Sequence, residues 1–378
     1  MVILKYYNED ESDYVAPSSR TNYDCIKTAS AEDAWLADRK VLHWAEKYRN
    51  YVVLGTGGSS LAGQAIKCAS NNKNVSFIDN ICPYEFYNWL ETLDINNTGI
   101  VVISKSGETI ETLAQIQLVL QKYHNIDEHI LIITENKEST LMKLRLAHNA
   151  LYIEHPKTIG GRFSVFSPVG MFPAYLMKQD IKSLKNGAVA ALQCNEFLRG
   201  ASFVLTSYKR KINNQVFMFY SPRLKKFGSW IEQLYAESTG KDGTGITPLL
   251  AKGTTDQHSK LQLYLGGPTD KIYSLFVEND DTSDLKFTNT VYPKYLENRS
   301  LNDLFTAEAY ATINALQNKH LPIRVFDFAN FSSYDLGWLF MHFMLETISV
   351  CKGLCVNPFD QSNVEEGKRL VKSKLSVI

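Results

Sequence analysis

Short apolar segments alternate with longer amphipathic ones along most of the chain. In the first half, four apolar segments predict strands, at residues 51–54, 75–79, 100–104 and 130–134. Apolar residues that recur every three or four positions predict helices from Leu61, over 84–93 and over 109–123. Short strands separated by helices are typical of parallel sheets that helices cover on both faces.

The second half repeats this alternation. Strands are predicted at 216–220, 246–250, 272–277 and 323–328. Helices are predicted at 227–237, 255–265, 301–318 and 333–353. Between the halves, residues 179–200 are rich in Lys, Asn and Ala and predict a linking helix. We therefore expect an α/β protein with two domains, 1–185 and 186–378, each built on a parallel sheet.

Composition narrows the class of protein. The 378 residues are 44% hydrophobic and 21% charged, which is typical of a soluble globular protein. Their formal net charge is zero, so nothing marks a nucleic-acid partner. The longest apolar run, 336–351, is too short to span a membrane and carries His342 and Glu346, which predicts a buried core helix. The N-terminus turns acidic at Glu9, too soon for a signal peptide, so we expect a cytoplasmic protein.

Cysteine and histidine spacing indicates no metal site. None of the six cysteines forms a C-x-x-C pair, and no cluster supplies the four ligands that zinc needs. Reduced thiols are the expected state. Seven histidines show no ligand spacing and receive no role: His43, His124, His129, His148, His155, His320 and His342.

Two loops have the composition of phosphate-binding loops. Gly55-Thr-Gly-Gly-Ser-Ser60 follows a predicted strand and opens a helix, where glycines let backbone N–H groups approach an anion. It matches neither the Walker loop nor the dinucleotide loop, and a purely structural tight turn is the alternative. The second loop, Ser104-Lys-Ser-Gly-Glu-Thr109, places three hydroxyls around a glycine at the next such junction. Helix capping by Ser106 or Thr109 is the alternative there, but two loops at adjacent strand ends favour an anion site.

Three further residues indicate proton chemistry on that anion. Arg162 follows two glycines, and its guanidinium would stabilise a developing oxyanion, with a surface salt bridge as the alternative. Glu237 and His258 stand about twenty residues apart, each beside a glycine-bearing turn. The alternatives are an ordinary helix-end carboxylate and a capping or packing histidine. Together with the loops, these residues predict proton transfer on a phosphorylated small molecule.

Six stretches in order resemble the glucose-6-phosphate isomerase family. Together they span positions 55 to 368, which is most of the chain. They are Gly-Thr-Gly-Gly-Ser-Ser-Leu, Ser-Lys-Ser-Gly-Glu-Thr-Ile-Glu-Thr, Gly-Gly-Arg-Phe-Ser-Val-Phe-Ser, Glu-Ser-Thr-Gly-Lys, Gly-Thr-Thr-Asp-Gln-His-Ser and Asn-Pro-Phe-Asp-Gln-Ser-Asn-Val-Glu-Glu-Gly-Lys. Two positions differ from the usual family pattern: the second loop reads Ser-Gly-Glu-Thr, and Ser362-Asn363 replaces a Pro-Gly.

The resemblance implies the sugar-isomerase fold, two αβα sandwiches with the active site between them, and a homodimer. It implies Glu237 as the base, Arg162 facing an enediolate, and Gln361 contacting the substrate. His258, reaching the site from the other subunit, and Lys368 would assist ring opening. The phosphate site would be lined by Gly58, Ser59, Ser104, Lys105, Ser106, Thr109 and Thr112.

The implied reaction interconverts glucose 6-phosphate and fructose 6-phosphate, a step of glycolysis and gluconeogenesis. It needs neither a metal nor a redox cofactor. Two alternatives stay open. The Ser-Gly-Glu-Thr loop motivates a dual phosphoglucose/phosphomannose isomerase. The other alternative is a sugar-phosphate-binding regulator without catalysis, which would have no use for Glu237, His258 and Lys368 together.

Overall fold

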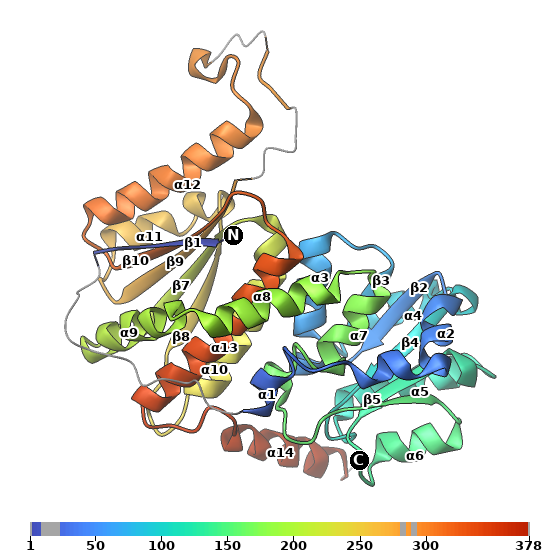
Figure 1. Cartoon of the computed structure of the whole chain (residues 1–378). Coiled ribbons are helices and arrows are strands. Elements are labelled where there is room, and N and C mark those ends of the chain that lie inside the picture. Colours follow the sequence, from blue (N-terminus) through green and yellow to red (C-terminus); the bar gives the residue numbers. More distant parts are fainter. Residues whose placement is uncertain (1, 9–22, 280–284, 289–292, 377–378) are drawn as a thin grey trace.

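Two five-stranded sheets stand side by side in the computed structural model, which describes residues 2–8, 23–279, 285–288 and 293–376 (Figure 1). Glu9, which entered the signal-peptide argument, lies outside these residues. The first sheet has the order β3-β2-β4-β5-β6, and all its strands are parallel. Its strands are β2 (Asn50–Leu54), β3 (Val75–Ile78), β4 (Thr98–Ile103), β5 (Ile130–Thr134) and β6 (Leu151–Glu154).

The second sheet has the order β1-β10-β9-β7-β8. Its strands are β1 (Val2–Tyr7), β7 (Asn214–Tyr220), β8 (Thr247–Lys252), β9 (Lys271–Glu278) and β10 (Ile323–Phe328). Four of them are parallel, whereas β1 runs antiparallel to β10. The predicted α/β fold with two parallel sheets is confirmed, with β1 as an antiparallel edge.

Fourteen helices are found among the described residues and cover the sheets. In the first half they are α1 (Asp24–Lys27), α2 (Arg39–Lys47), α3 (Leu61–Ser70), α4 (Pro83–Thr92), α5 (Ile110–Lys122), α6 (Thr140–Ala147) and α7 (Pro168–Leu176). In the second half they are α8 (Ile181–Gln193), α9 (Glu196–Lys209), α10 (Lys225–Thr239), α11 (Leu261–Gly266), α12 (Leu301–Asn318), α13 (Ser333–Gly353) and α14 (Glu365–Leu375).

Alternate strand residues face two different cores, as the two-residue period of a strand requires. Val53 and Val101 belong to a central core that both sheets share, together with residues of α3, α7, α8, α9, α10 and α13. Their neighbours Leu54 and Val102 belong to an outer core under α4, α5 and α6. A third core lies between the second sheet and helices α11 and α12. Each sheet is therefore sandwiched between helical layers.

Helix α13 runs through the central core, and this confirms the predicted core helix. Its start is fixed by a capping box in which Ser332 and Asp335 satisfy each other's backbone N–H groups. From Asp335 to Cys351 almost every side chain is buried. Gly187 of α8 and Gly337 of α13 allow the two helices to approach closely, because a Cβ at either glycine would come within 1.9 Å of a carbonyl oxygen of the other helix.

Some segments differ from the predictions. Strands β1 and β6 were not predicted, and residues 179–200 hold α8 and the start of α9 instead of one linking helix. Residues 255–265 divide into a 3-10 turn, Thr255–His258, and the short α11, because the Asp256 carboxylate accepts the Lys252 amide and tightens the chain there. The domain division at residue 185 stays a prediction, although β1 lies in the sheet of the second half.

Candidate active site

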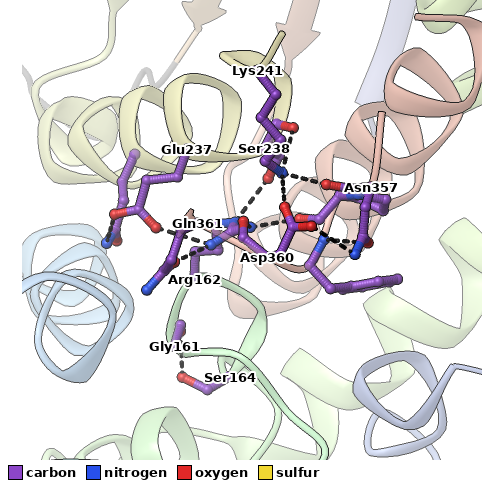
Figure 2. Close-up of polar contacts among 12 residues, drawn as sticks. Gly161, Arg162, Ser164, Glu237, Ser238, Lys241, Asn357, Asp360 and Gln361 are labelled. Carbon is purple, nitrogen blue, oxygen red and sulfur yellow. Dashed lines mark hydrogen bonds and ion pairs between the residues drawn. The ribbon is translucent and has the colours of Figure 1, made fainter. Parts of the chain in front are cut away.

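The Arg162 guanidinium stands at the centre of a polar cluster where three distant parts of the chain meet (Figure 2). Its short 3-10 turn, Gly161–Phe163, lies between β6 and α7, and the side chain is only 2% exposed. Nε donates to Ser238 Oγ (2.8 Å), and Nη1 donates to Glu237 Oε2 (3.0 Å) and Gln361 Oε1 (2.5 Å). Nη2 donates to two backbone carbonyls, those of Pro358 (2.6 Å) and Asp360 (2.9 Å).

All five N–H groups of this arginine therefore have a protein acceptor. Burial lowers the pKa of Arg162, and the adjacent charge of Glu237 acts in the opposite direction. A guanidinium stays charged through such a shift, because its ordinary pKa lies far above neutrality. Arg162 is thus a fixed, desolvated positive charge held in one orientation.

Glu237 lies in the last turn of α10, where the helix faces Arg162. Apolar residues at three- and four-residue spacing, among them Phe227 and Leu234, pack one side of α10 into the core, so Glu237 is left on the other side. Its Oε2 accepts from Arg162, and its Oε1 accepts from Gln233 Nε2 at 2.9 Å. The side chain is 30% exposed. The carboxylate is oriented on both oxygens and still reaches solvent.

Glycines bring the first predicted phosphate loop against this cluster. A Cβ on Gly58 would lie 2.3 Å from the carbonyl carbon of Gly161, so only glycine permits this approach of the two backbones. The Ser164 hydroxyl donates to Gly161 O at 2.6 Å and lies 3.4 Å from Gly58 O. The loop after β2 and the turn that carries Arg162 are consequently one packed unit.

A cavity of about 250 Å³ opens beside Glu237. It lies between the end of α10 and the segment that follows α13. Its lining comprises Ala236, Glu237, Gly240, Lys241, Gln361, Ser362, Asn363 and Val364. The cavity gives a small molecule access to the Glu237 carboxylate.

The second predicted phosphate loop follows β4, the neighbour of β2 in the sheet. Successive strands β3 and β4 lie on opposite sides of β2, so both loops stand where the strand order reverses, at the carboxyl ends of parallel strands. Ser104 Oγ and Thr109 Oγ1 are 2.8 Å apart and share a hydrogen bond. Thr109 occupies the N-cap position of α5, but its side chain makes no capping hydrogen bond. Within the part of the chain that the structure describes, the first backbone N–H groups of α5 therefore have no side-chain cap.

Other residues of this loop, and Thr112 in the helix that follows it, have different surroundings. Lys105 Nζ lies 3.6 Å from the carboxylate of Glu135. Thr112 is fully buried, and its hydroxyl has no hydrogen-bond partner among the described residues, so a ligand does not reach it in this arrangement. The Glu108 carboxylate accepts the Thr140 amide (2.6 Å) and hydroxyl (2.8 Å) at the start of α6, and these bonds lower its pKa. Its charge is directed to that helix N-terminus.

The structure does not bring His258 or Lys368 to Glu237. His258 is exposed at the end of the turn after β8, and no hydrogen bond or ion pair to it is found among the described residues. Lys368 is 63% exposed on α14 and pairs with Glu365 at 2.6 Å. Every residue of α14 from Glu365 to Leu375 is exposed. Of the four predicted catalytic residues, only Arg162 and Glu237 are in contact within the chain.

Comparisons with known proteins establish the family. The model of the phosphoglucose isomerase family matches residues 41–276, which is more than half of the chain. The chain belongs to the phosphoglucose isomerase family. A probable glucose-6-phosphate isomerase of Methanococcus maripaludis is 33% identical over 353 residues, 88% of this chain and 80% of the relative. A glucose-6-phosphate isomerase of Thermus thermophilus is 33% identical over 358 residues, 89% of this chain and 86% of the relative.

Solved structures agree with membership of the phosphoglucose isomerase family. A protein of Thermus thermophilus, described as hypothetical, matches with a TM-score of 0.85 and 31% identity over 93% of this chain and 89% of that one. A glucose-6-phosphate isomerase of Chlamydia trachomatis matches with a TM-score of 0.79 over 98% of this chain and 81% of that one, and at 23% identity it shows the fold. The resemblance inferred from six motifs is confirmed.

Some contacts in this phosphoglucose isomerase family member were not predicted. Ser238 and Lys241 stand inside the Glu-Ser-Thr-Gly-Lys motif, and Pro358 and Asp360 contribute backbone carbonyls, which no side-chain pattern reveals. Gln233 precedes Glu237 by one helical turn, and that spacing was the available signal. Among the described residues, no group of three or more His, Cys, Asp or Glu side chains could hold a metal ion. No helix in the described ranges is long and apolar enough to cross a membrane.

Proposed function

We propose that the chain interconverts glucose 6-phosphate and fructose 6-phosphate through an enediolate, with Glu237 as the base. One observation carries the proposal: the Glu237 carboxylate is fixed between Arg162 and Gln233 and borders an open cavity. Family membership and relatives named glucose-6-phosphate isomerase support the same reaction.

Glu237 moves the proton in this mechanism. In the open-chain sugar, the carbon beside the aldehyde is acidic enough for a carboxylate to remove its proton. Glu237 returns that proton to the neighbouring carbon, which converts the aldose to the ketose. Hydrogen bonds to both carboxylate oxygens limit the rotation of Glu237 and keep it aimed at the cavity.

Arg162 stabilises the negative charge of the enediolate. Since all its N–H groups have acceptors, one of these acceptors must give way to a substrate oxygen. Gln361 is the acceptor that leaves, because its side chain is exposed and lines the cavity, whereas the carbonyls of Pro358 and Asp360 belong to the backbone. Once Gln361 has given way, a desolvated guanidinium of fixed orientation faces the developing oxyanion.

The phosphate is held at the carboxyl ends of β2 and β4. Ser59, Ser106 and Thr109 supply hydroxyls there, and the uncapped start of α5 supplies backbone N–H groups. Ser104 is buried like Thr112, and its hydroxyl is hydrogen-bonded to Thr109 Oγ1, so it orients Thr109. Anchoring this distant end orients the reacting carbons at Glu237. Thr112 takes no direct part, because it is buried.

His258 and Lys368, which would assist ring opening, lie on the surface of the chain. We include in the proposal a homodimer in which His258 reaches the site of the second copy. The His258 turn is built to present the residue outward: Gln257 Nε2 donates to Thr312 Oγ1 at 2.6 Å and so anchors the turn to α12. A cytoplasmic location is part of the same proposal.

A coupled assay with fructose 6-phosphate tests the function directly. Pure protein should form glucose 6-phosphate, at the same rate with and without a chelator. Mannose 6-phosphate in a parallel reaction distinguishes the dual isomerase, which alone turns over both sugars. Binding of fructose 6-phosphate without any turnover would leave the non-catalytic regulator and overturn the proposal.

A further inference from the structure

Lys241 joins the two parts of the chain that hold Arg162. It stands two residues after the end of α10, and its side chain is only 10% exposed. Its Nζ donates to Ser238 O at 3.0 Å and to Asn357 O, and it pairs with Asp360 Oδ1 at 3.0 Å (Figure 2). An ammonium has three N–H donors, and here each has an acceptor.

Through these contacts, Lys241 connects the groups that accept hydrogen bonds from Arg162. Ser238, whose backbone Lys241 contacts, accepts Arg162 Nε through its hydroxyl. Asn357 and Asp360, the other two acceptors, flank the carbonyl of Pro358 on Arg162 Nη2, and Asp360 adds its own carbonyl to the same nitrogen. Lys241 thereby fixes the distance between the end of α10 and segment 357–361.

Capping of α10 explains only one of the three contacts. A lysine after a helix commonly binds the last carbonyls, and Ser238 O is one of these. The contacts to Asn357 and Asp360 run to residues more than 110 positions away in the chain. The hydrogen bond from Lys241 also lowers the pKa of Asp360, so this carboxylate is ionised at neutral pH.

We propose that Lys241 is a positioning residue for the isomerase reaction. It holds the backbone of segment 357–361 against Arg162 while the Gln361 side chain exchanges with the substrate. Without this tie, the segment and α10 separate, and both the Arg162 guanidinium and the Glu237 carboxylate lose their alignment. The inference rests on the isomerase activity proposed above.

Substitution Lys241→Met tests the proposal, because it keeps the aliphatic stem and removes all three donors. We expect kcat for fructose 6-phosphate to fall by about 10- to 100-fold, as for a misalignment of about 1 Å, and KM to change less than about threefold. Lys241→Arg should recover part of kcat, because it keeps the charge but its planar fork does not match three converging acceptors. This variant also serves if Lys241→Met does not fold.

Two matched variants separate positioning from loss of an ion pair. Asp360→Asn removes the ion pair and leaves the contacts of Lys241 to the carbonyls of Ser238 and Asn357. Because the Asp360 side chain is 52% exposed, this variant should lower kcat less than Lys241→Met does. Lys47, at the end of α2, forms a surface ion pair with Glu128 at 2.6 Å. Lys47→Met removes this ion pair and should leave kcat unchanged.

Three outcomes would overturn the proposal. In one, Lys241→Met lowers the melting temperature and keeps the wild-type kcat, which assigns the residue to stability alone. In the second, KM rises while kcat stays constant, which assigns it to substrate binding. In the third, Asp360→Asn loses as much kcat as Lys241→Met, which assigns the effect to the ion pair and not to the contact of Lys241 with the backbone of segment 357–361. A wild-type protein without turnover would instead refute the proposed function, so the two failures are distinguishable.

Discussion

Two arginine–glutamate pairs involve α10, one through Glu237 and the other through a contact with Tyr235, and they differ in what surrounds the carboxylate. In the Arg324–Glu346 pair, both side chains are fully buried, and the guanidinium bonds both carboxylate oxygens at 2.5 and 2.8 Å. The Tyr235 hydroxyl and His342 Nε2 add further hydrogen bonds to the same carboxylate. In the Arg162–Glu237 pair, the arginine is buried but the glutamate is 30% exposed and accepts a single bond from it.

The different surroundings of the two carboxylates indicate a structural role for one pair and a chemical role for the other. Glu346 has no oxygen left for a ligand and no path to one, so its pair ties α13 to β10 within the core. Glu237 keeps free lone pairs that face a cavity, and its arginine is saturated mainly by other groups. The same pair of residue types therefore serves packing in Arg324–Glu346, the closed pair, and is available for catalysis in Arg162–Glu237, the open pair.

Removing the open carboxylate should have the largest effect on activity. Glu237→Gln keeps the shape and still offers an oxygen to Arg162, but it cannot accept the proton. We expect kcat to fall by about 10²- to 10⁴-fold. The free energy of unfolding should fall by about 1–2 kcal/mol, less than for a fully buried pair, because Glu237 is 30% exposed and the other N–H groups of Arg162 keep their acceptors. Turnover within twofold of wild type, measured in the coupled assay, would remove Glu237 from the mechanism and erase the contrast between the pairs.

Breaking the closed pair should have the opposite profile. Glu346→Gln leaves the buried Arg324 charge without a counterion, and we expect a loss of about 3–5 kcal/mol in the free energy of unfolding by urea. The kcat of the folded protein should stay within about threefold of wild type. Arg324→Met with Glu346→Leu removes both charges and should recover most of the loss. A kcat as low as that of Glu237→Gln would make the two pairs functionally alike.

The sequence marks both residues of the open pair as site candidates, although it does not predict their contact, and it misses the closed pair. Arg162 and Glu237 stand near glycines in recognisable stretches, which marks each as a candidate site residue, and their catalytic roles stay predictions. Arg324 lies in a predicted strand and Glu346 in a predicted helix, 22 positions apart, and nothing local marks them as partners. Their pairing depends on the packing of α13 against β10, which is a long-range property.

The same reason explains which elements were predicted. Helices α12 and α13 coincide with the predicted segments, because capping and periodicity are local and both begin with a capping box. The partner of β1 is β10, more than 300 positions away, and no local pattern contains that information. The expected contributions of His258 and Lys368 stay predictions, since they depend on contacts outside the single chain or on a different placement of α14.

Helix α10 links the two pairs through Tyr235, two residues before Glu237. Tyr235 is fully buried, and its hydroxyl donates to the Glu346 carboxylate. Tyr235→Phe should lower the free energy of unfolding by about 1.5–3 kcal/mol, the range for a hydrogen bond to a charged group, with kcat nearly unchanged. Tyr273→Phe is the matched control, because that buried hydroxyl is 3.4 Å from a neutral carbonyl and should cost less than about 1 kcal/mol. Equal losses in the two variants would show that the charge of Glu346 adds nothing.

The closed pair should also make the free energy of unfolding depend on pH in the acid range. Burial raises the pKa of Glu346, but the charge and hydrogen bonds of Arg324, with those of His342, outweigh burial and bring the pKa down to about 2, from an ordinary value of 4.5. Because the folded-state pKa is the lower one, the unfolded chain takes up the proton first as the pH falls. The stabilisation is therefore complete above pH 4.5 and is lost between there and about pH 2.

Between pH 5 and 3.5, wild type should lose about 1 kcal/mol more than the Arg324→Met/Glu346→Leu variant in urea titrations. Exposed carboxylates with lowered pKa values, such as Glu108 and Asp360, are present in both proteins and cancel in this difference. Identical acid profiles would mean that Glu346 titrates alike in the folded and unfolded chains, and the contrast between a closed and an open pair would then rest on exposure alone.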